Sequence, residues 1–321
     1  MQSVSTNAPF YLDCDTGIDD SLALSYLLSC KDIDLLGVGT VSGNVSAQRA
    51  AQNTLDLLSL AGREDVPVAV GSHDPLCGLF SGGVPHIHGG NGVGNVQLPS
   101  STRKPANETA ADLLVRLARQ HAGQLHVVTI GPLTNIAQAL ALEPKLPELV
   151  KSLTIMGGAA LAPGNLSPVA EANIGNDPEA AAKVFAAPWD ITLVPLDVTL
   201  NSTLEEVDRA ALLASSRPMA NALGRMLDLY FDFYVNTYGR RCCALHDPMA
   251  AAIAVNAIAL RNAPIVTTVI DDTHGPGRGQ TICDLRGYRR GYSAQPGAHC
   301  RVVLELGSEF TPHLLDRLLS L

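Results

Sequence analysis

The chain has 321 residues, a formal net charge of −9, and 46% hydrophobic against 17% charged residues, which is apolar enough for one large α/β domain. The negative charge argues against a nucleic-acid backbone as partner and fits a metal or a small ligand. No apolar run approaches the ~18 residues of a membrane span. The first ten residues lack the basic and apolar segments of a signal peptide. Seven cysteines without metal-like spacing indicate buried thiols in a reducing cytoplasm.

The first predicted element is a buried strand over residues 10–12 that runs into four carboxylates within eight positions. They are Asp13, Asp15, Asp19 and Asp20. An apolar helical pattern over residues 22–28 follows, so the order is strand, glycine turn and helix start. Four carboxylates this close repel one another unless a cation lies among them. Ligands that are all oxygen atoms favour calcium or magnesium.

Aspartates in such a stretch can also belong to patterns that do not require this kind of cation site. Each aspartate alone could be a helix cap or a surface charge. An EF-hand loop is rejected, because Gly17 comes too early and a strand precedes it. A phosphatase of the haloacid dehalogenase type also carries an aspartate pair after an apolar strand, but that pattern does not explain Asp19 and Asp20.

Strand-like and helix-like runs alternate through the rest of the chain. Further strands are predicted from Leu35 to a turn at Gly43, and over residues 66–71, 125–131, 152–158 and 191–197. Helices are predicted over residues 46–60, 108–121, 204–214, 219–238 and 246–258, with another opened by Pro132. Residues 72–106 have no clear period, which is typical of a functional loop or lid. Residues 265–270 and 301–306 are predicted as an edge hairpin or late strands.

This alternation predicts a mostly parallel sheet with helices on both faces. No linker or repeat interrupts it, so one domain over residues 1–321 is expected. Ligands bind beyond the carboxyl ends of the strands in such sheets. Polar and small residues follow several predicted strands at that edge, including Asn44, Thr129 to Gly131, and Met156 to Gly158.

Three later stretches carry candidate functional groups. Residues 86–95 mix histidines with glycines and, taken alone, indicate a flexible loop. In residues 164–181, Asn176 or Asp177 is expected to cap the helix that continues through Pro178. That cap leaves Glu171 and Asn173 unexplained, unless they belong to a solvated loop. His246 and Asp247 begin an alanine-rich helix, where Asp247 has the plain interpretation of a cap.

Together these motifs resemble the nucleoside hydrolases, the inosine-uridine preferring N-ribohydrolases. DCDTGIDD resembles the DxDxxxDD signature of that family. The agreement continues in order through VSGN, the HG of residues 88–89, TIGPLTNIA, MGG, GN followed by AEANI and DPEAA, and HDP. Seven matches in the right order, from residue 13 to residue 248, make the resemblance specific.

The resemblance implies an open, mostly parallel, Rossmann-like α/β sheet. It implies calcium-dependent hydrolysis of the N-glycosidic bond of ribonucleosides to ribose and free nucleobase, by a homodimer or homotetramer. Asp15, Asp20 and Asp247 match the carboxylate ligands of the calcium ion, and Ile130 matches a backbone carbonyl ligand. Asp15 would also be the general base that activates water, and His246 the general acid beside the leaving nucleobase.

The resemblance further implies a set of substrate-binding residues. These are Asp19, Asn44, His88, Met156, Asn165, Glu171, Asn173 and Tyr234. Ala172 stands where an aromatic residue commonly packs on the ribose, and the one tryptophan, Trp189, precedes a strand. Purine-specific relatives stack the base on tryptophans, so a base-tolerant or pyrimidine-preferring enzyme is expected. A non-catalytic protein that binds calcium and nucleosides remains the alternative, although Asp15 and His246 favour an enzyme.

Overall fold

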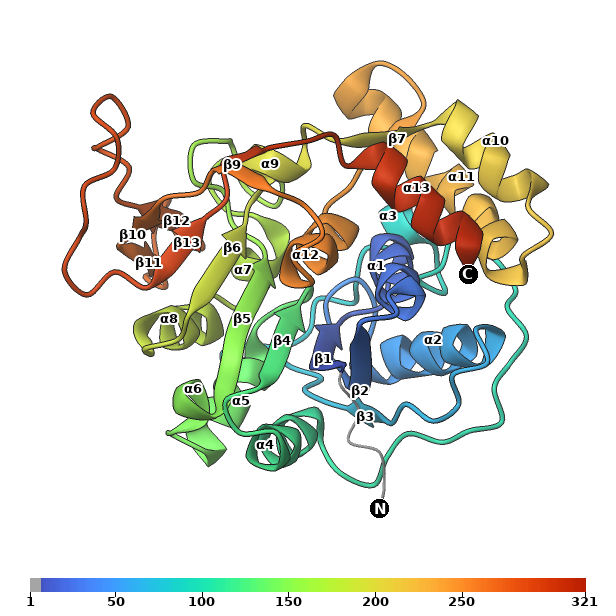
Figure 1. Ribbon diagram of the computed structural model, residues 1–321, viewed down its shortest axis with the longest axis horizontal. Coiled ribbons are helices and arrows are strands. Elements are labelled where there is room, and N and C mark those ends of the chain that lie inside the picture. The colour runs from blue at the N-terminus through green and yellow to red at the C-terminus, as the bar shows by residue number, and fades with distance from the viewer. Residues whose placement is uncertain (1–6) are drawn as a thin grey trace.

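The computed structural model describes residues 7–321, which are built around an eight-stranded sheet (Figure 1). Its strands in chain order are β1 (Ala8–Cys14), β2 (Ile33–Thr40), β3 (Val68–Val70), β4 (Leu125–Thr129), β5 (Val150–Met156), β6 (Ile191–Val194), β10 (Ile265–Val266) and β13 (Cys300–Val302). Their spatial order is β10-β13-β6-β5-β4-β1-β2-β3. All neighbours pair in parallel except β10 and β13. The predicted mostly parallel sheet is therefore confirmed.

Helices cover both faces of this sheet, each over its own apolar core. One face carries α1 (Ile18–Ser29), α2 (Ala47–Leu60), α11 (Pro218–Tyr238), α12 (Asp247–Ala254) and α13 (Thr311–Ser320). The other carries α4 (Ala110–Gln120), α5 (Thr134–Leu142) and α8 (Pro178–Ala186). Because both faces are covered, β1 is buried along almost its whole length, and its sequence is a continuous apolar run rather than an alternating one.

Short helices and strand pairs complete the chain around this sheet. The short helices are α3 (Pro85–His88), α6 (Leu146–Leu149), α7 (Ala172–Asn176), α9 (Leu196–Thr199) and α10 (Glu206–Ala214). Three antiparallel pairs lie outside the main sheet: β7 (Thr203–Glu205) with β8 (Cys242–Ala244), β9 (Leu260–Asn262) with β14 (Glu305–Leu306), and β11 (Thr268–Ile270) with β12 (Thr281–Cys283). Among the described residues, no helix has the length and apolar character needed to cross a bilayer.

Some element boundaries differ from the sequence prediction for local physical reasons. The helix expected over 246–258 ends at Ala254, because Asn256 adopts a positive φ of 56° and turns the chain. Asp177, and not Asn176, caps α8 by accepting a hydrogen bond from the N–H of Ala180. The stretch 72–106 contains α3 but no strand. Of the two late runs, β13 extends the main sheet beside β6, and β10 pairs with it at the edge.

The centre of the sheet is where its strand order reverses. From β1 the chain proceeds to β2 and β3 on one side, and then returns to β4 on the other side of β1. Loops leaving β1 and β4 therefore diverge and leave a crevice at their carboxyl ends, which is the usual ligand site in open α/β sheets. The acidic stretch after β1 lies at this position.

Candidate active site

Asp13, the residue before the last of β1, is used to hold this strand in place. Its carboxylate accepts hydrogen bonds from the Tyr11 hydroxyl at 2.8 Å and from the Asn135 amide at 3.1 Å. Tyr11 and Asp13 are two apart on the strand and so share one face. Complete burial raises the pKa of Asp13 to about 6, although both hydrogen bonds counteract this. Asp13 is therefore a buried link between β1 and α5 rather than a member of the acidic cluster.

Asp15 and Asp20 form a closed turn between β1 and α1. The backbone N–H groups of Asp15 and Gly17 both donate to the Asp20 carboxylate, at 3.1 and 2.7 Å. Asn44, beyond the end of β2, donates its backbone N–H to Asp15 Oδ2 at 2.6 Å and its amide to Asp20 Oδ2 at 3.1 Å. A Cβ on Gly17 would lie 2.6 Å from Nδ1 of His88. Only glycine fits this turn without displacing a neighbouring group.

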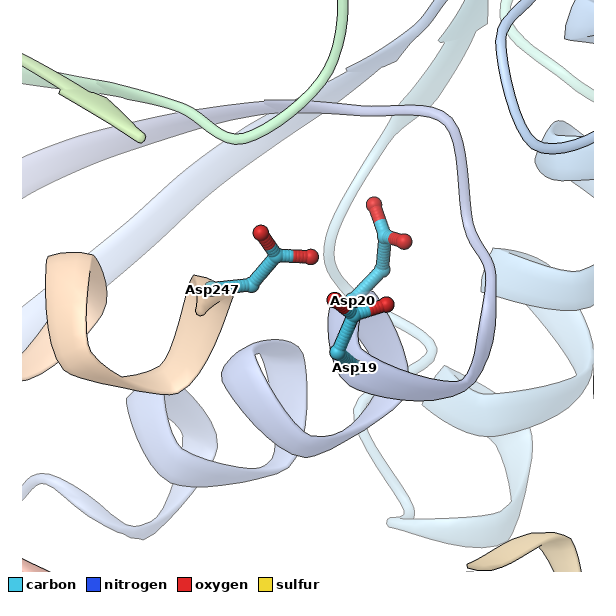
Figure 2. Close-up of side chains that lie close together, drawn as sticks. All are labelled: Asp19, Asp20 and Asp247. Carbon is cyan, nitrogen blue, oxygen red and sulfur yellow. The ribbon is translucent and has the colours of Figure 1, made fainter. Parts of the chain in front are cut away.

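Three carboxylates converge where α1 and α12 begin. One oxygen each from Asp19, Asp20 and Asp247 lie within 4.8 Å of one another, and all three residues are buried. Figure 2 shows Asp247, from the first turn of α12, directed toward the first turn of α1 that carries the other two. The predicted calcium set named Asp15 where this cluster has Asp19. Asp15 nevertheless borders the cluster through its contact with Asp20.

The electrostatics of this cluster are unfavourable without a cation. Burial, followed by the negative charge of neighbouring carboxylates, raises the pKa of Asp15 and Asp247 well above the ordinary value and that of Asp20 to about 7. Among the described residues, Asp15 Oδ1 and Asp19 Oδ1 are buried without a hydrogen-bond partner. Buried oxygens without partners are costly. A hard divalent cation would neutralise the repulsion and use these oxygens, so the donor set fits calcium or magnesium.

The ends of β4 and β5 contribute backbone oxygens to the same crevice. The Asn173 amide donates to the carbonyl of Ile130 at 2.9 Å and to the carbonyl of Met156 at 3.2 Å. Ile130 also pairs with β1 through its N–H, which donates to the Asp13 carbonyl. A carbonyl oxygen has two lone pairs, so Ile130 retains one for a cation. Asn173 therefore ties α7 to two strand ends beside the acidic cluster.

Glu171 and Asn165 hold the segment that leads into α7. The Glu171 carboxylate accepts hydrogen bonds from the backbone N–H groups of Gly158, Asn173 and Ile174. Glu171 is 2% exposed, so it does not belong to a solvated loop, the alternative left open by the sequence. Burial raises its pKa to about 7 in spite of these bonds. Asn165 Oδ1 accepts from the N–H of Ala172 at 2.9 Å.

Aromatic and histidine side chains line the opposite side of the acidic cluster. His88 Nδ1 accepts the N–H of Ile18 at 3.0 Å, which leaves the proton of a neutral ring on Nε2. His246 has both ring nitrogens engaged: Nδ1 lies 2.8 Å from the Thr199 hydroxyl, and Nε2 lies 2.6 Å from the Tyr234 hydroxyl. Burial lowers the pKa of both histidines. This side is therefore built from neutral, hydrogen-bonded groups.

The sequence prediction missed two residues that contact this site. Tyr230 donates its hydroxyl to Asp19 Oδ2 at 2.9 Å, and Thr199 contacts His246. Tyr230 precedes Tyr234 by four positions on α11, a spacing that places both on one helix face and could have identified it. Thr199 carried no comparable signal, because α9 is one turn long and has no sequence relation to His246.

Comparisons with known proteins agree with this geometry. A model of the family described as inosine-uridine preferring nucleoside hydrolase matches residues 10–310. Uridine nucleosidase 1 of Arabidopsis thaliana is 36% identical over 289 residues, which is 89% of this chain and 84% of the relative. A plant nucleoside hydrolase structure superposes with a TM-score of 0.91 at 30% identity, covering 98% of this chain and 99% of the other. The structure of the purine-preferring ribonucleoside hydrolase of Gardnerella vaginalis superposes with a TM-score of 0.87 at 32% sequence identity, covering 97% of each chain.

Fold, site and comparisons together define an enzyme that hydrolyses N-glycosyl bonds, a ribonucleoside hydrolase. The chain belongs to the inosine-uridine preferring nucleoside hydrolase family. This result confirms the family, the enzyme class and the fold expected from the sequence, and it leaves the phosphatase and the non-catalytic binding protein without support.

Proposed function

We propose that the chain is a calcium-dependent ribonucleoside hydrolase that prefers uridine and other pyrimidine nucleosides. The observation that supports a bound metal is the pair of buried oxygens on Asp15 and Asp19 that lack a hydrogen-bond partner among the described residues. Burial and the charge of neighbouring carboxylates also raise the pKa of Asp15 and of Asp247. Calcium is favoured over magnesium because the candidate ligands are carboxylates plus a backbone carbonyl, in a shell that can expand beyond six oxygens. Asp15, Asp20, Asp247 and the carbonyl of Ile130 would hold it.

The preference for pyrimidine nucleosides is supported by a relative and by a side chain. The Arabidopsis thaliana relative is named a uridine nucleosidase. The one tryptophan, Trp189, is 2% exposed in the core between the sheet and α4, α5 and α8, so it is not available to stack a purine. The purine-preferring relative from Gardnerella vaginalis shares the fold, which means that the side chains at the base pocket decide the preference.

The residues around the ribose are proposed to stabilise positive charge. Hydrolysis passes through an oxocarbenium-like sugar, and carboxylates beside it favour that charge. Asp15 is the general base, since its carboxylate is buried and its Oδ1 has no hydrogen-bond partner among the described residues. A bound calcium ion would lower the pKa of the attacking water and hold ribose hydroxyls. Asp19 and Asn173 bind ribose hydroxyls at the ring.

The remaining predicted residues divide between the two ends of the substrate. Asn165 and Glu171 hold the 5′-hydroxyl, on the segment that leads into α7. His88, Met156 and Tyr234 line the pocket for the nucleobase, and Asn44 supports the metal-binding turn. His246 assists departure of the nucleobase, and the 2.6 Å contact between its Nε2 and the Tyr234 hydroxyl makes the two residues act as a pair.

Incubation of the purified protein with uridine, cytidine, inosine and adenosine tests this proposal. Ribose is assayed as reducing sugar, with calcium present and after removal of metal by a chelator. Uridine should be cleaved fastest, and activity should disappear with the metal and return with calcium. Full activity in chelator, or restoration by zinc but not by calcium, would contradict the proposed cofactor. Faster cleavage of inosine than of uridine would contradict the proposed preference.

Three further properties are proposed for the chain as a whole. A single domain over residues 1–321 is supported by the one eight-stranded sheet and by the absence of a linker pattern in the sequence. A cytoplasmic location agrees with the seven cysteines, all of which are free thiols. A homodimer or homotetramer is implied only by the resemblance to the family, and light scattering during size-exclusion chromatography measures the oligomeric state directly.

A further inference from the structure

Thr199 is a buried residue whose hydroxyl faces a functional histidine. It ends α9, the single turn between β6 and β7, and has no exposed surface. Its Oγ1 lies 2.8 Å from Nδ1 of His246, on the far side of the ring from Tyr234. No other hydrogen bond of the Thr199 hydroxyl occurs within residues 7–321. The threonine and the histidine therefore depend on one another for hydrogen bonding.

The direction of this hydrogen bond follows from counting protons. A threonine hydroxyl has one hydrogen, which must find an acceptor in a site that water does not reach. If Nδ1 carried the proton, Thr199 could only accept, and its own hydrogen would be buried without a partner. If Nδ1 is unprotonated, Thr199 donates to it and every polar atom of the contact is satisfied. A ring that carried both protons would leave the same Thr199 hydrogen without an acceptor, so the arrangement requires the neutral ring.

The tautomer of His246 then decides where the hydrogen of Tyr234 points. A proton on Nε2 makes the imidazole the donor across its 2.6 Å contact with the Tyr234 hydroxyl oxygen. Tyr234 is then free to donate its own hydrogen elsewhere. Tyr234 keeps 6% of its surface exposed whereas Thr199 keeps none, so the Tyr234 hydrogen is the one that can be left for solvent or substrate. In the tautomer with the proton on Nδ1, Nε2 would accept the Tyr234 hydrogen, which could then not be donated to another group. Tyr230 stands perpendicular to Tyr234 with ring centroids 5.0 Å apart, and its hydroxyl already donates to Asp19.

We propose that Thr199 is a positioning residue that, by donating to Nδ1 of His246, holds the ring proton on Nε2 and thereby leaves the Tyr234 hydroxyl hydrogen for the departing nucleobase. The inference deepens the proposed function, because it rests on the roles assigned there to His246 and Tyr234. A donated hydrogen bond stabilises negative charge as it develops on the nucleobase. A leaving group that is already a stable anion needs no such help.

A matched pair of variants tests the hydroxyl separately from the shape of the side chain. Thr199→Val keeps the shape and removes the hydroxyl, whereas Thr199→Ser keeps the hydroxyl and removes a methyl group. Thr199→Val should lower kcat on uridine by about 10–100-fold, by analogy with the partners that orient metal-ligating histidines, with KM nearly unchanged. Turnover of p-nitrophenyl riboside should change by less than about threefold, since its leaving group needs little stabilisation. Thr199→Ser should retain most activity on both substrates.

The tautomer itself is measured by 15N NMR of histidine-labelled protein. The chain has nine histidines, so the His246 signals are assigned by their loss in His246→Gln. The wild-type ring should show a protonated Nε2 and an unprotonated Nδ1, and Thr199→Val should lose this single pattern. Thr268→Val, which alters another buried threonine on β11, should change neither the signals nor kcat.

Three results would overturn the inference. The first is a protonated Nδ1 in the neutral His246 ring of the wild type. The second is a kcat on uridine for Thr199→Val that equals that of the wild type. The third is an equal loss of kcat in Thr199→Ser and Thr199→Val. His246→Ala measured in parallel separates this failure from failure of the proposed function. If His246→Ala loses activity on uridine but not on p-nitrophenyl riboside, while Thr199→Val retains activity on uridine, only the proposed role of Thr199 is contradicted. If His246→Ala loses activity on uridine and p-nitrophenyl riboside equally, the proposed role of His246 in departure of the nucleobase is itself contradicted.

Discussion

The two sides of the active site are built on opposite principles. On the sugar side, buried carboxylates repel one another, and two of their oxygens have no hydrogen-bond partner within the described residues. On the nucleobase side, His88, His246, Tyr230 and Tyr234 all have hydrogen-bond partners from the protein itself. The first side is incomplete without a cation and positive charge on the substrate, whereas the side chains of the second are already held in place by the protein before substrate arrives. Changes on the sugar side should therefore affect every substrate, and changes on the nucleobase side only those with poor leaving groups.

The largest effect is expected from Asp15→Asn, which acts on the sugar side. The amide cannot accept the proton of the attacking water, so turnover should fall by about 10²–10⁴-fold. Uridine and p-nitrophenyl riboside should be affected alike, because both need the water. Steady-state kinetics on the two substrates measure this, with circular dichroism to verify the fold. A variant that keeps activity on either substrate would contradict the role of Asp15.

His246→Ala is the corresponding change on the nucleobase side. Its turnover of uridine and inosine should fall by about 10²–10⁴-fold, the range for general acid assistance. Hydrolysis of p-nitrophenyl riboside should scarcely change, because that leaving group departs as an anion. The ratio of the two rates, measured on one enzyme preparation, is independent of how much protein is active. A ratio equal to that of the wild type would remove His246 from the chemistry and leave Tyr234 or His88 as the next candidates.

Asp247→Asn tests whether repulsion on the sugar side is relieved by a cation. No hydrogen bond to the Asp247 side chain occurs among the described residues, whereas Asp20 accepts three, so Asp247 can lose its charge with the least disturbance. Calcium affinity by titration calorimetry should fall by on the order of 100-fold, because ligand charge sets affinity. Without calcium, the variant should melt at a higher temperature than the wild type. Asp112→Ala, an exposed first-turn aspartate of α4, is the control and should leave calcium affinity unchanged.

The smallest effect concerns the pH dependence of stability through Glu171. Burial raises its pKa from 4.5 to about 7, so between these values the folded protein holds a proton that the unfolded chain releases. The free energy of unfolding therefore falls as pH rises through this window. The loss of stability caused by ionising the buried Glu171 is complete above about pH 7. In calcium-free protein, Glu171→Gln should gain at most roughly 3 kcal/mol relative to wild type between pH 4.5 and 7.5.

Urea unfolding of both proteins across this pH range measures the effect of Glu171. The lost hydrogen-bond acceptor in the glutamine variant adds a constant offset, so only the slope against pH is informative. Parallel curves for the two proteins would show that Glu171 keeps an ordinary pKa in the folded state.

The order of the elements could be read from the sequence because it depends on local patterns. Buried strands such as β1 and β5 are short apolar runs between turn residues, and helices such as α2 and α11 carry their own periodic apolar faces. Ends set by a single backbone conformation, such as the positive φ of Asn256 after α12, were not predictable in this way. Nor could the sequence choose between hairpin and late strands for β10 and β13, since that choice depends on pairing across the sheet.

The sequence by itself determined which residue types the site would contain and that they would gather at the carboxyl edge of a parallel sheet. Motifs around Asp15, Glu171 and Asp247 carried that information, because strand ends and helix starts are local features. Only the tertiary structure decided the partners. It directed Asp13 to Tyr11 and Asn135, brought Asp19 within 4.8 Å of Asp20 and Asp247, and set Thr199 against His246. Such contacts join positions far apart in the chain, and their geometry follows from how helices pack on the sheet rather than from any spacing in the sequence.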